Sequence, residues 1–270
     1  MIADVLSVYG QEVAPDRKTA GDIAYKIANL LNWWGDKTVA QISTKYCKEY
    51  SATRGNSGAG ADLKTLRAAV GHWNREYGPL TVMPSFWKPQ EPPPRERYLS
   101  RSEVAKLLWA ARRDQHIKRM ILLGIYTGSR PGVILALEGS QIDLGAGVLI
   151  RTKHGAAQSK NKKAPSVRLG RRIMTHLLRW KRMDGDAKFV CHLMGRPTHD
   201  PHTSWRKIVK ASKLKGKITR HTLRHTRATW MAQAGVPLFE AAGFLGMTVR
   251  TLERTYAHHD PAHQERAANI

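Results

Sequence analysis

The stretch HTLRHTRATW, residues 221–230, places two histidines and two arginines on adjacent turns of a predicted helix. His221 and Arg224 are three residues apart, so their side chains leave the helix on the same face. A guanidinium group binds two phosphate oxygens through its planar fork, and an imidazole transfers a proton near neutral pH. The pair therefore suits a site that binds a phosphate and moves a proton beside it, although a solvated basic face gives the same pattern.

The opposite face of this helix is expected to lie in the core, with Leu223, Trp230 and Ala234 as its apolar residues. Arg227 falls within the same apolar stripe, and the helical pattern does not account for it. Two residues with the spacing HxxR are weak evidence for a site, so the interpretation depends on partners elsewhere in the chain.

Three further positions carry groups that suit such a site. Arg130 follows a long apolar segment and a glycine turn, in YTGSRPG. Lys160 lies in the basic loop HGAAQSKNKKAPSVRL, at the predicted tip of a hairpin. Tyr256 stands late in the last predicted helix, in TLERTYAHHDP, 14 residues before the end of the sequence. Arg130 alone also fits a structural ion pair, and Lys160 alone fits a solvated turn or a contact with a phosphate backbone.

Taken in order, these residues resemble the tyrosine recombinase (phage integrase) family over about residues 97–260. The family pattern is an arginine after a TG turn, a hairpin lysine, an HxxR helix and a C-terminal tyrosine. The resemblance implies a site-specific recombinase that cuts and rejoins double-stranded DNA through a covalent 3′-phosphotyrosyl intermediate. It also implies a homo-tetramer on DNA, formed from subunits that are monomers in free solution.

The resemblance assigns a role to each residue. Tyr256 would attack the scissile phosphate, and Arg130 and Arg224 would hold its non-bridging oxygens. Lys160 would act as general acid toward the leaving 5′-oxygen, and His221 would assist proton transfer. Because the covalent link conserves the energy of the bond, the reaction is expected to need no ATP, no metal ion and no other cofactor.

Two positions depart from the family pattern. Val133 stands three residues after Arg130, where the family usually has an acid. Met247 follows Leu245-Gly246, where many members have a histidine or a tryptophan, and a thioether cannot donate a hydrogen bond in their place. Nearby histidines are auxiliary candidates that could compensate, namely His225, His258 and His259. These departures leave open a catalytically decayed DNA-binding protein of the same fold.

The charge balance points to a polyanionic partner. Lys and Arg number 45 against 21 for Asp and Glu, a formal net charge of +24. Residues 1–94 account for +2 of this and residues 95–270 for +22. An excess of this size in one half of a chain is typical of nucleic-acid binding. We expect double-stranded DNA as the partner, with no membrane and no small-molecule substrate.

Other classes of protein fit less well. A metal-dependent nuclease using HHDPAH, residues 258–263, lacks a partner motif elsewhere in the chain. A topoisomerase would share the chemistry, but a separate binding domain favours recombination between two sites. Two isolated cysteines predict neither a disulfide nor a zinc site. No secretion signal and no apolar run of 18 residues is seen, so a cytoplasmic protein of a bacterium or phage is expected.

The elements that must position these residues fall into two predicted domains. Five prolines within 82–98 interrupt any helix, and the charge step falls at the same place. We therefore predict a helical core-binding (SAM-like) domain at 1–82, a proline-rich linker at 83–97 and a catalytic domain at 98–270. The fold class is mainly α, with a small β-sheet or hairpin in the second domain.

Periodicity and turn signals predict the individual elements. In the first domain, helices are expected at 3–13, 20–34, 39–51 and 60–77. In the second, SRSE at 100–103 is a capping box that opens a helix, and strands at 148–152 and 166–169 form a hairpin around the basic loop. The other predicted helices of this domain are 117–127, 130–138, 171–183, 202–212, 220–234, 237–245 and 248–257.

Overall fold

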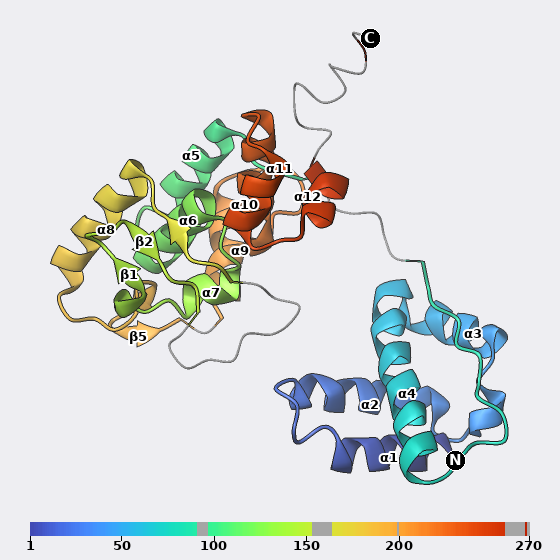
Figure 1. Cartoon of the computed structure of the whole chain (residues 1–270). Helices are drawn as coiled ribbons and strands as arrows, with labels where there is room; N and C mark the ends of the chain where they lie inside the picture. Colours follow the sequence, from blue (N-terminus) through green and yellow to red (C-terminus); the bar gives the residue numbers. More distant parts are fainter. Residues whose placement is uncertain (91–96, 153–163, 199, 257–267, 269–270) are drawn as a thin grey trace. The chain divides into compact units, whose positions relative to one another are not determined.

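The computed structural model describes residues 1–90, 97–152, 164–198, 200–256 and 268 (Figure 1). The chain forms two compact units, Met1–Pro94 and Arg95–Ile270, which divide within the proline-rich segment. Helices predominate in both units and small sheets occur in the second, so the predicted fold class is confirmed. Within the described ranges, no helix has the length and apolar character needed to cross a bilayer.

The first unit is built on one long helix against which the others pack. Its described elements are α1 (Ile2–Glu12), α2 (Ala20–Trp34), η1 (Val39–Gln41), α3 (Thr44–Arg54) and α4 (Asn56–Glu76). Helix α4 contacts α1, α2 and α3 (Figure 1). The core between them includes the fully buried Trp34, Leu30 and Leu66. The apolar spacing of α2 and α4 in the sequence is thus the spacing of their buried faces.

One predicted helix of this unit begins later than expected. The segment 39–51 is divided into the short 3₁₀ helix η1 and the α-helix α3. Ser43 separates them as the N-cap of α3, where its hydroxyl accepts a hydrogen bond from the backbone nitrogen of Tyr46. A serine at this position satisfies one of the free N–H groups of the first turn, which explains where the α-helix starts.

The second unit combines helices with two small sheets. Its first elements are α5 (Arg101–Ala110), α6 (Gln115–Thr127), α7 (Pro131–Leu135), η2 (Gly139–Gln141), β1 (Ile142–Asp143), β2 (Val148–Leu149) and β3 (Val167–Arg168). They are followed by α8 (Arg171–Asp184), β4 (His192–Leu193), β5 (Arg196–Pro197), α9 (His202–Ala211), α10 (Arg220–Gln233), α11 (Leu238–Leu245) and α12 (Val249–Tyr256). The predicted capping box opens α5, because Ser100 Oγ accepts from the nitrogen of Glu103 at 3.1 Å and the Glu103 carboxylate accepts from the nitrogen of Ser100 at 2.9 Å.

The predicted hairpin is present but its strands are shorter than expected. Strands β2 and β3 pair antiparallel, with Val148 opposite Arg168 and Leu149 opposite Val167. Strand β1 adds to the other edge of β2, in the order β1-β2-β3. Neither β1 nor the pair β4-β5 was expected, because strands of two residues are too short to show an alternating pattern.

Helix α6 lies in the middle of the second unit and brings the distant parts of the chain together (Figure 1). It packs closely on α10, since a Cβ added to Gly124 would lie 2.9 Å from side-chain atoms of Leu223. Leu223 is buried and Trp230 is half-buried, as predicted, but Ala234 is exposed because it is already the C-cap of α10. This packing sets the end of α6 beside the first turns of α10.

Candidate active site

The turn that follows α6 is the centre of the site. Gly128 ends the helix in the left-handed conformation, with φ of 63°. A Cβ at this position would also lie 2.4 Å from Leu245 Cδ2. Only glycine satisfies both conditions without strain, which explains the TG of the sequence. The chain leaves the turn as Arg130, the N-cap of α7.

Arg224 lies on α10 and reaches this turn from the other side. Its side chain is buried, and its Nη1 donates a hydrogen bond of 2.7 Å to the carbonyl oxygen of Gly128. Its Nη2 is also buried, and it has no hydrogen-bond partner among the described residues. A buried guanidinium nitrogen without a partner costs free energy unless a ligand supplies an acceptor. The site thus keeps one donor for an oxygen that none of the described residues provides.

Arg130 is the second cation of the site. Its Nη2 donates to the carbonyl oxygen of Gly246 at 3.2 Å. Gly246 ends α11 in the left-handed conformation, so this bond ties α11 to the turn after α6. The pKa of Arg224 is lowered to about 10, mainly by burial and then by the positive charge of Arg130. The two guanidinium groups are therefore close enough to repel each other.

A third guanidinium group, that of Arg151, comes from the chain just after β2. Its Nε donates to Ser129 Oγ at 2.9 Å, its Nη2 to the carbonyl oxygen of Thr127 at 2.6 Å and its Nη1 to that of Phe244 at 2.7 Å. Burial, followed by the charges of Arg224 and Arg130, lowers its pKa to about 9. Arg151 thus holds the turn through its bonds to Thr127 and Ser129, and it adds positive charge to the site.

His221 stands at the exposed edge of the cluster, on the second residue of α10. Its pKa is lowered by partial loss of solvent and then by the charges of Arg224, Arg220 and Arg130. Both effects favour the neutral form of the imidazole. Arg151 and Arg224 pair with no carboxylate among the described residues. An arrangement of this kind stabilises an anion brought in from outside.

Tyr256 is the last residue of α12, and its ring is buried. It belongs to a small core formed by α10, α11 and α12, which includes Met231, Leu245 and Leu252. Its hydroxyl forms a hydrogen bond with Nδ1 of His225. Burial raises the pKa of the phenol to about 12, and the charge of Arg224 opposes this rise. The phenol therefore lies within the electrostatic reach of the arginine that carries the free donor.

The structure thus brings together four of the five residues predicted to be catalytic, namely Arg130, His221, Arg224 and Tyr256. They come from the end of α6, from α10 and from α12. The fifth, Lys160, lies outside the described residues, as do the histidines of HHDPAH at 258–263. The auxiliary candidate His225 contacts Tyr256 directly, whereas Met247 packs against the small core around Tyr256.

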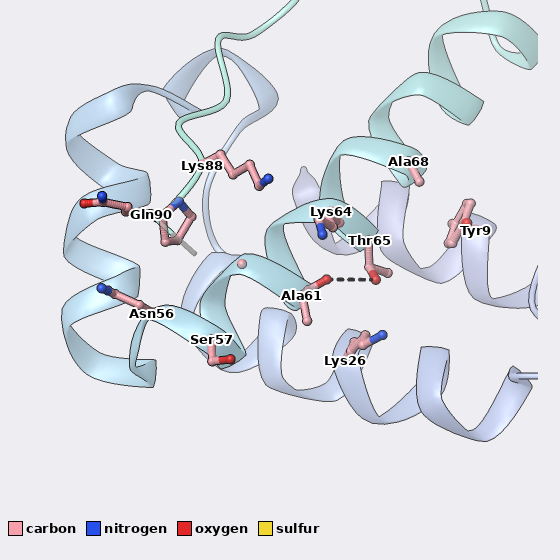
Figure 2. Close-up of a pocket in the computed structure, with 12 residues that line it drawn as sticks. Tyr9, Lys26, Asn56, Ser57, Ala61, Lys64, Thr65, Ala68, Lys88 and Gln90 are labelled. Carbon is pink, nitrogen blue, oxygen red and sulfur yellow. Dashed lines mark hydrogen bonds between the residues drawn. The ribbon is translucent and has the colours of Figure 1, made fainter. Parts of the chain in front are cut away.

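A separate basic hollow of about 580 Å³ lies in the first unit. Lys26 from α2, Lys64 from α4 and Lys88 from the following segment surround it (Figure 2). Polar side chains of Asn56 and Ser57, at the start of α4, line the same hollow. Three of the basic residues of a unit with little net charge therefore gather at one place, which is favourable for a phosphate-bearing ligand.

A family model described as "Phage integrase family" matches residues 97–263. This range covers more than half of the chain and contains all the residues of the site. The chain belongs to the phage integrase family.

Curated relatives agree with this assignment. The chain is 28% identical over 215 residues to the integrase of Salmonella phage P22, and the aligned region covers 74% of this chain and 54% of that protein. It is 26% identical over 182 residues to the tyrosine recombinase XerA of Pyrococcus furiosus, covering 66% of this chain and 63% of that protein. The chain thus spans between about half and two thirds of the length of these relatives.

Solved structures show the same fold. The Tn1549 transposon integrase in complex with transposon right end DNA has a TM-score of 0.78 at 17% identity, over 99% of both chains. A lambda integrase dimer bound to a COC′ core site has a TM-score of 0.74 at 20% identity, over 94% of this chain and 76% of that chain. Identities this low support the fold and no more.

The departures from the pattern of the phage integrase family have clear positions in the structure. Val133 lies in α7, and its backbone nitrogen donates to the carbonyl oxygen of Arg130 at 2.9 Å. Its apolar side chain supplies no acid at that position. Met247 follows the Gly246 cap and contributes an apolar contact to the core around Tyr256. A thioether offers no hydrogen-bond donor there.

Arg151 was not among the residues predicted from the sequence. In IRTKHG it looks like one more cation of a basic loop, and its burial depends on contacts with Thr127, Ser129 and Phe244, which are distant along the chain. One signal was available, because Arg151 lies near the end of the predicted strand 148–152, which leads into the loop. Arg227, which the helical pattern left without explanation, stacks on Phe244 with its Cζ 5.2 Å from the ring centre.

Proposed function

We propose that the protein is a site-specific DNA recombinase, an integrase that cuts and rejoins duplex DNA through a covalent 3′-phosphotyrosyl intermediate. One observation carries the proposal. The buried Nη2 of Arg224 has no partner among the described residues, and the same arginine acts on the phenol of Tyr256. A phosphate oxygen that accepts a hydrogen bond from this nitrogen would set the phosphorus atom beside the attacking hydroxyl.

The charges around Tyr256 decide when it reacts. With a pKa of about 12, only about one phenol in 10⁵ is ionised at pH 7. Attack therefore requires that the proton leaves as the bond to phosphorus forms, and that the added negative charge is stabilised. Arg130 and Arg224 would bind the two non-bridging oxygens of the pentacoordinate transition state. Fixed donors of this type typically contribute about 10²–10³ in rate each.

The proposed reaction balances without an external energy source. The Tyr256 oxygen forms a bond to phosphorus, and the bond from phosphorus to the 5′-oxygen breaks. Lys160 would protonate the leaving 5′-oxygen, and His221 would assist the transfer of protons at the exposed edge of the site. The phosphotyrosyl ester keeps the energy of the original bond, so a 5′-hydroxyl can reverse the step with no ATP and no metal ion.

DNA is the proposed partner of both units. The formal charge of +24 favours a polyanion, and the lysines around the hollow of the first unit favour contacts with backbone phosphates. We propose that the first unit acts as the core-binding domain and that the second performs the reaction. Lambda integrase has been described as a tetramer bound to a Holliday junction. By analogy, we propose monomers in solution, a tetramer on DNA and action in the cytoplasm.

The second candidate function is a DNA-binding protein of this family that has lost catalysis. Val133 and Met247 favour it, because both replace polar groups of the family pattern with apolar ones. The retention of the whole predicted catalytic set argues against it, namely Arg130, Lys160, His221, Arg224 and Tyr256.

Covalent capture of DNA separates the candidates. The full chain is incubated in EDTA with nicked duplexes that have a randomised centre, so that cleavage near the nick releases a short fragment and traps the adduct. We expect an adduct that is stable in detergent, and we expect none with Tyr256→Phe. Binding of duplex DNA without any adduct would favour the decayed protein. Dependence on a divalent metal ion would favour a nuclease.

A further inference from the structure

The hydroxyl of Tyr256 has a specific neighbour that the family pattern does not assign. Among the described residues, its one hydrogen bond is with Nδ1 of His225. His225 is half-buried and is followed on α10 by residues of the small core that holds Tyr256. The two rings lie with their centres 5.9 Å apart and their planes tilted by 42°. The hydroxyl oxygen of Tyr256 thus meets a ring nitrogen of His225 directly, as a proton transfer requires, and the two rings are not stacked.

We propose that His225 is the general base that removes the proton from Tyr256 during attack on the phosphate. This inference rests on the proposed function and deepens it, because it names the group that activates the nucleophile. A neutral imidazole that carries its hydrogen at Nε2 accepts a hydrogen bond at Nδ1. The tyrosine hydroxyl then points its hydrogen at His225 and leaves a lone pair of its oxygen for the bond to phosphorus.

His221 is less well placed for this task. It lies at the exposed edge of the cluster, and the charges of Arg130, Arg220 and Arg224 act on it. A proton accepted there would join three cations, whereas the hydroxyl of Tyr256 is already in hydrogen-bond contact with Nδ1 of His225. His221 therefore fits a role at the phosphate and the leaving group, and His225 fits a role at the nucleophile.

The surroundings of Tyr256 make a built-in base necessary. Its ring is 3% exposed, so bulk water has little access to the hydroxyl to take the proton. Met247, the residue at the position where the family often has a histidine, contributes only an apolar contact. Of the described side chains, His225 is the basic group in hydrogen-bond contact with the phenol.

The proposed step is balanced. As the Tyr256 oxygen bonds to phosphorus, its O–H bond breaks and the proton moves to Nδ1 of His225. The bond between phosphorus and the 5′-oxygen breaks, and that oxygen receives a proton from the general acid. The products are a phosphotyrosyl ester, an imidazolium ion and a 5′-hydroxyl. In strand joining the same imidazolium returns its proton to the departing phenolate.

The test compares His225→Ala and His225→Gln with the unchanged protein on a nicked duplex first selected by covalent capture with that protein. The prior selection of the duplex separates the two proposals, because failure to capture any DNA would contradict the proposed function and not this inference. We expect a single-turnover rate of adduct formation lower by about 10²–10⁴-fold in both variants. The affinity for the duplex should stay within about twofold, since in this proposal His225 acts on the nucleophile.

Chemical rescue distinguishes a base from a structural side chain. Added imidazole should raise the rate of His225→Ala in proportion to its concentration, while sodium chloride of equal ionic strength should not. The matched control is His202→Gln, an exposed histidine at the start of α9, which should react like the unchanged protein. Thermal unfolding of each variant shows that the fold is retained.

Two results would overturn the inference. If His225→Ala forms the adduct as fast as the unchanged protein, or faster, then the contact restrains the phenol and does not activate it. If His225→Ala is slow and added imidazole does not restore its rate, while His225→Gln is fully active, then the residue only supports the position of Tyr256.

Discussion

Arg224 Nη1 donates a hydrogen bond of 2.7 Å to the carbonyl oxygen of Gly128, 96 residues earlier in the chain. This bond fixes the helix that carries His221 and Arg224 to the turn that carries Arg130. The other terminal nitrogen of Arg224 is buried and has no hydrogen-bond partner in the described part of the chain. One arginine thus both assembles the site and offers it a donor, and this combination determines what its substitution should do.

Arg224→Lys tests the planar fork of this arginine. Lysine keeps the charge but cannot bind Gly128 and a phosphate oxygen at the same time with fixed geometry. We expect adduct formation to slow by about 10²–10³-fold, with a smaller effect on duplex binding. Single-turnover kinetics and a binding titration measure the two quantities. Equal losses in both would show that Arg224 serves binding alone.

Gly128→Ala tests the turn itself. Its φ of 63° disfavours any residue with a Cβ, and the added atom would lie 2.4 Å from Leu245. We expect the free energy of unfolding to fall by about 1–3 kcal/mol, measured by denaturant titration. The matched control is Gly132→Ala in α7, where an added Cβ meets no atom within 4 Å. A stability loss equal to that of Gly132→Ala would contradict this account of the TG turn.

The outcome at this turn shows what the sequence could and could not predict. The turn, the HxxR helix and the capping box at Ser100 are local patterns, and each forms as its residues indicate. The pairing of His225 with Tyr256 and the burial of Arg151 depend on contacts between segments far apart in the chain. Neither periodicity nor spacing carries that information, so Arg151 looked like an ordinary cation of a basic loop and His225 was only an auxiliary candidate without an assigned partner.

Lys160 is expected to protonate the leaving 5′-oxygen. With an ordinary duplex, Lys160→Ala should therefore form the adduct about 10²–10⁴-fold more slowly than the unchanged protein. It should react at nearly the normal rate when the bridging 5′-oxygen is replaced by sulfur, because a thiolate leaves without protonation. The control is Lys162→Ala in the same loop. If Lys162→Ala or Lys153→Ala shows this pattern of rescue instead, the general acid is that lysine and not Lys160.

The hollow of the first unit should contribute to the salt dependence of DNA binding. Each phosphate contact of a lysine releases a counterion, so the slope of log Kd against log salt decreases by about 1 when one is lost. We expect this for Lys64→Gln, measured with a duplex of arbitrary sequence. Lys45→Gln, an exposed lysine of α3 outside the hollow, is the control. An unchanged slope for Lys64→Gln would show that DNA does not contact the hollow.

The lowered pKa of the buried His116 predicts how the stability of the fold depends on pH. Burial is the main cause that lowers its pKa below 6.5 in the folded chain, and Asp114 opposes the shift. The unfolded chain then binds more protons than the folded one just below pH 6.5, so stability falls as the pH is lowered through this range. Denaturant unfolding at pH 7.5 and 5.5 measures the loss. His116→Gln should reduce it, and an unchanged pH dependence would contradict the assigned shift.

The most direct measurement is to identify the residue that carries the DNA after covalent capture. The adduct is digested with trypsin and nuclease, and the modified peptide is sequenced by mass spectrometry. We predict a nucleotide joined through its 3′-phosphate to the tyrosine of residues 255–266, the tryptic peptide that begins after Arg254. Attachment to any other residue, or through a 5′-phosphate, would contradict the assignment of Tyr256 as the nucleophile.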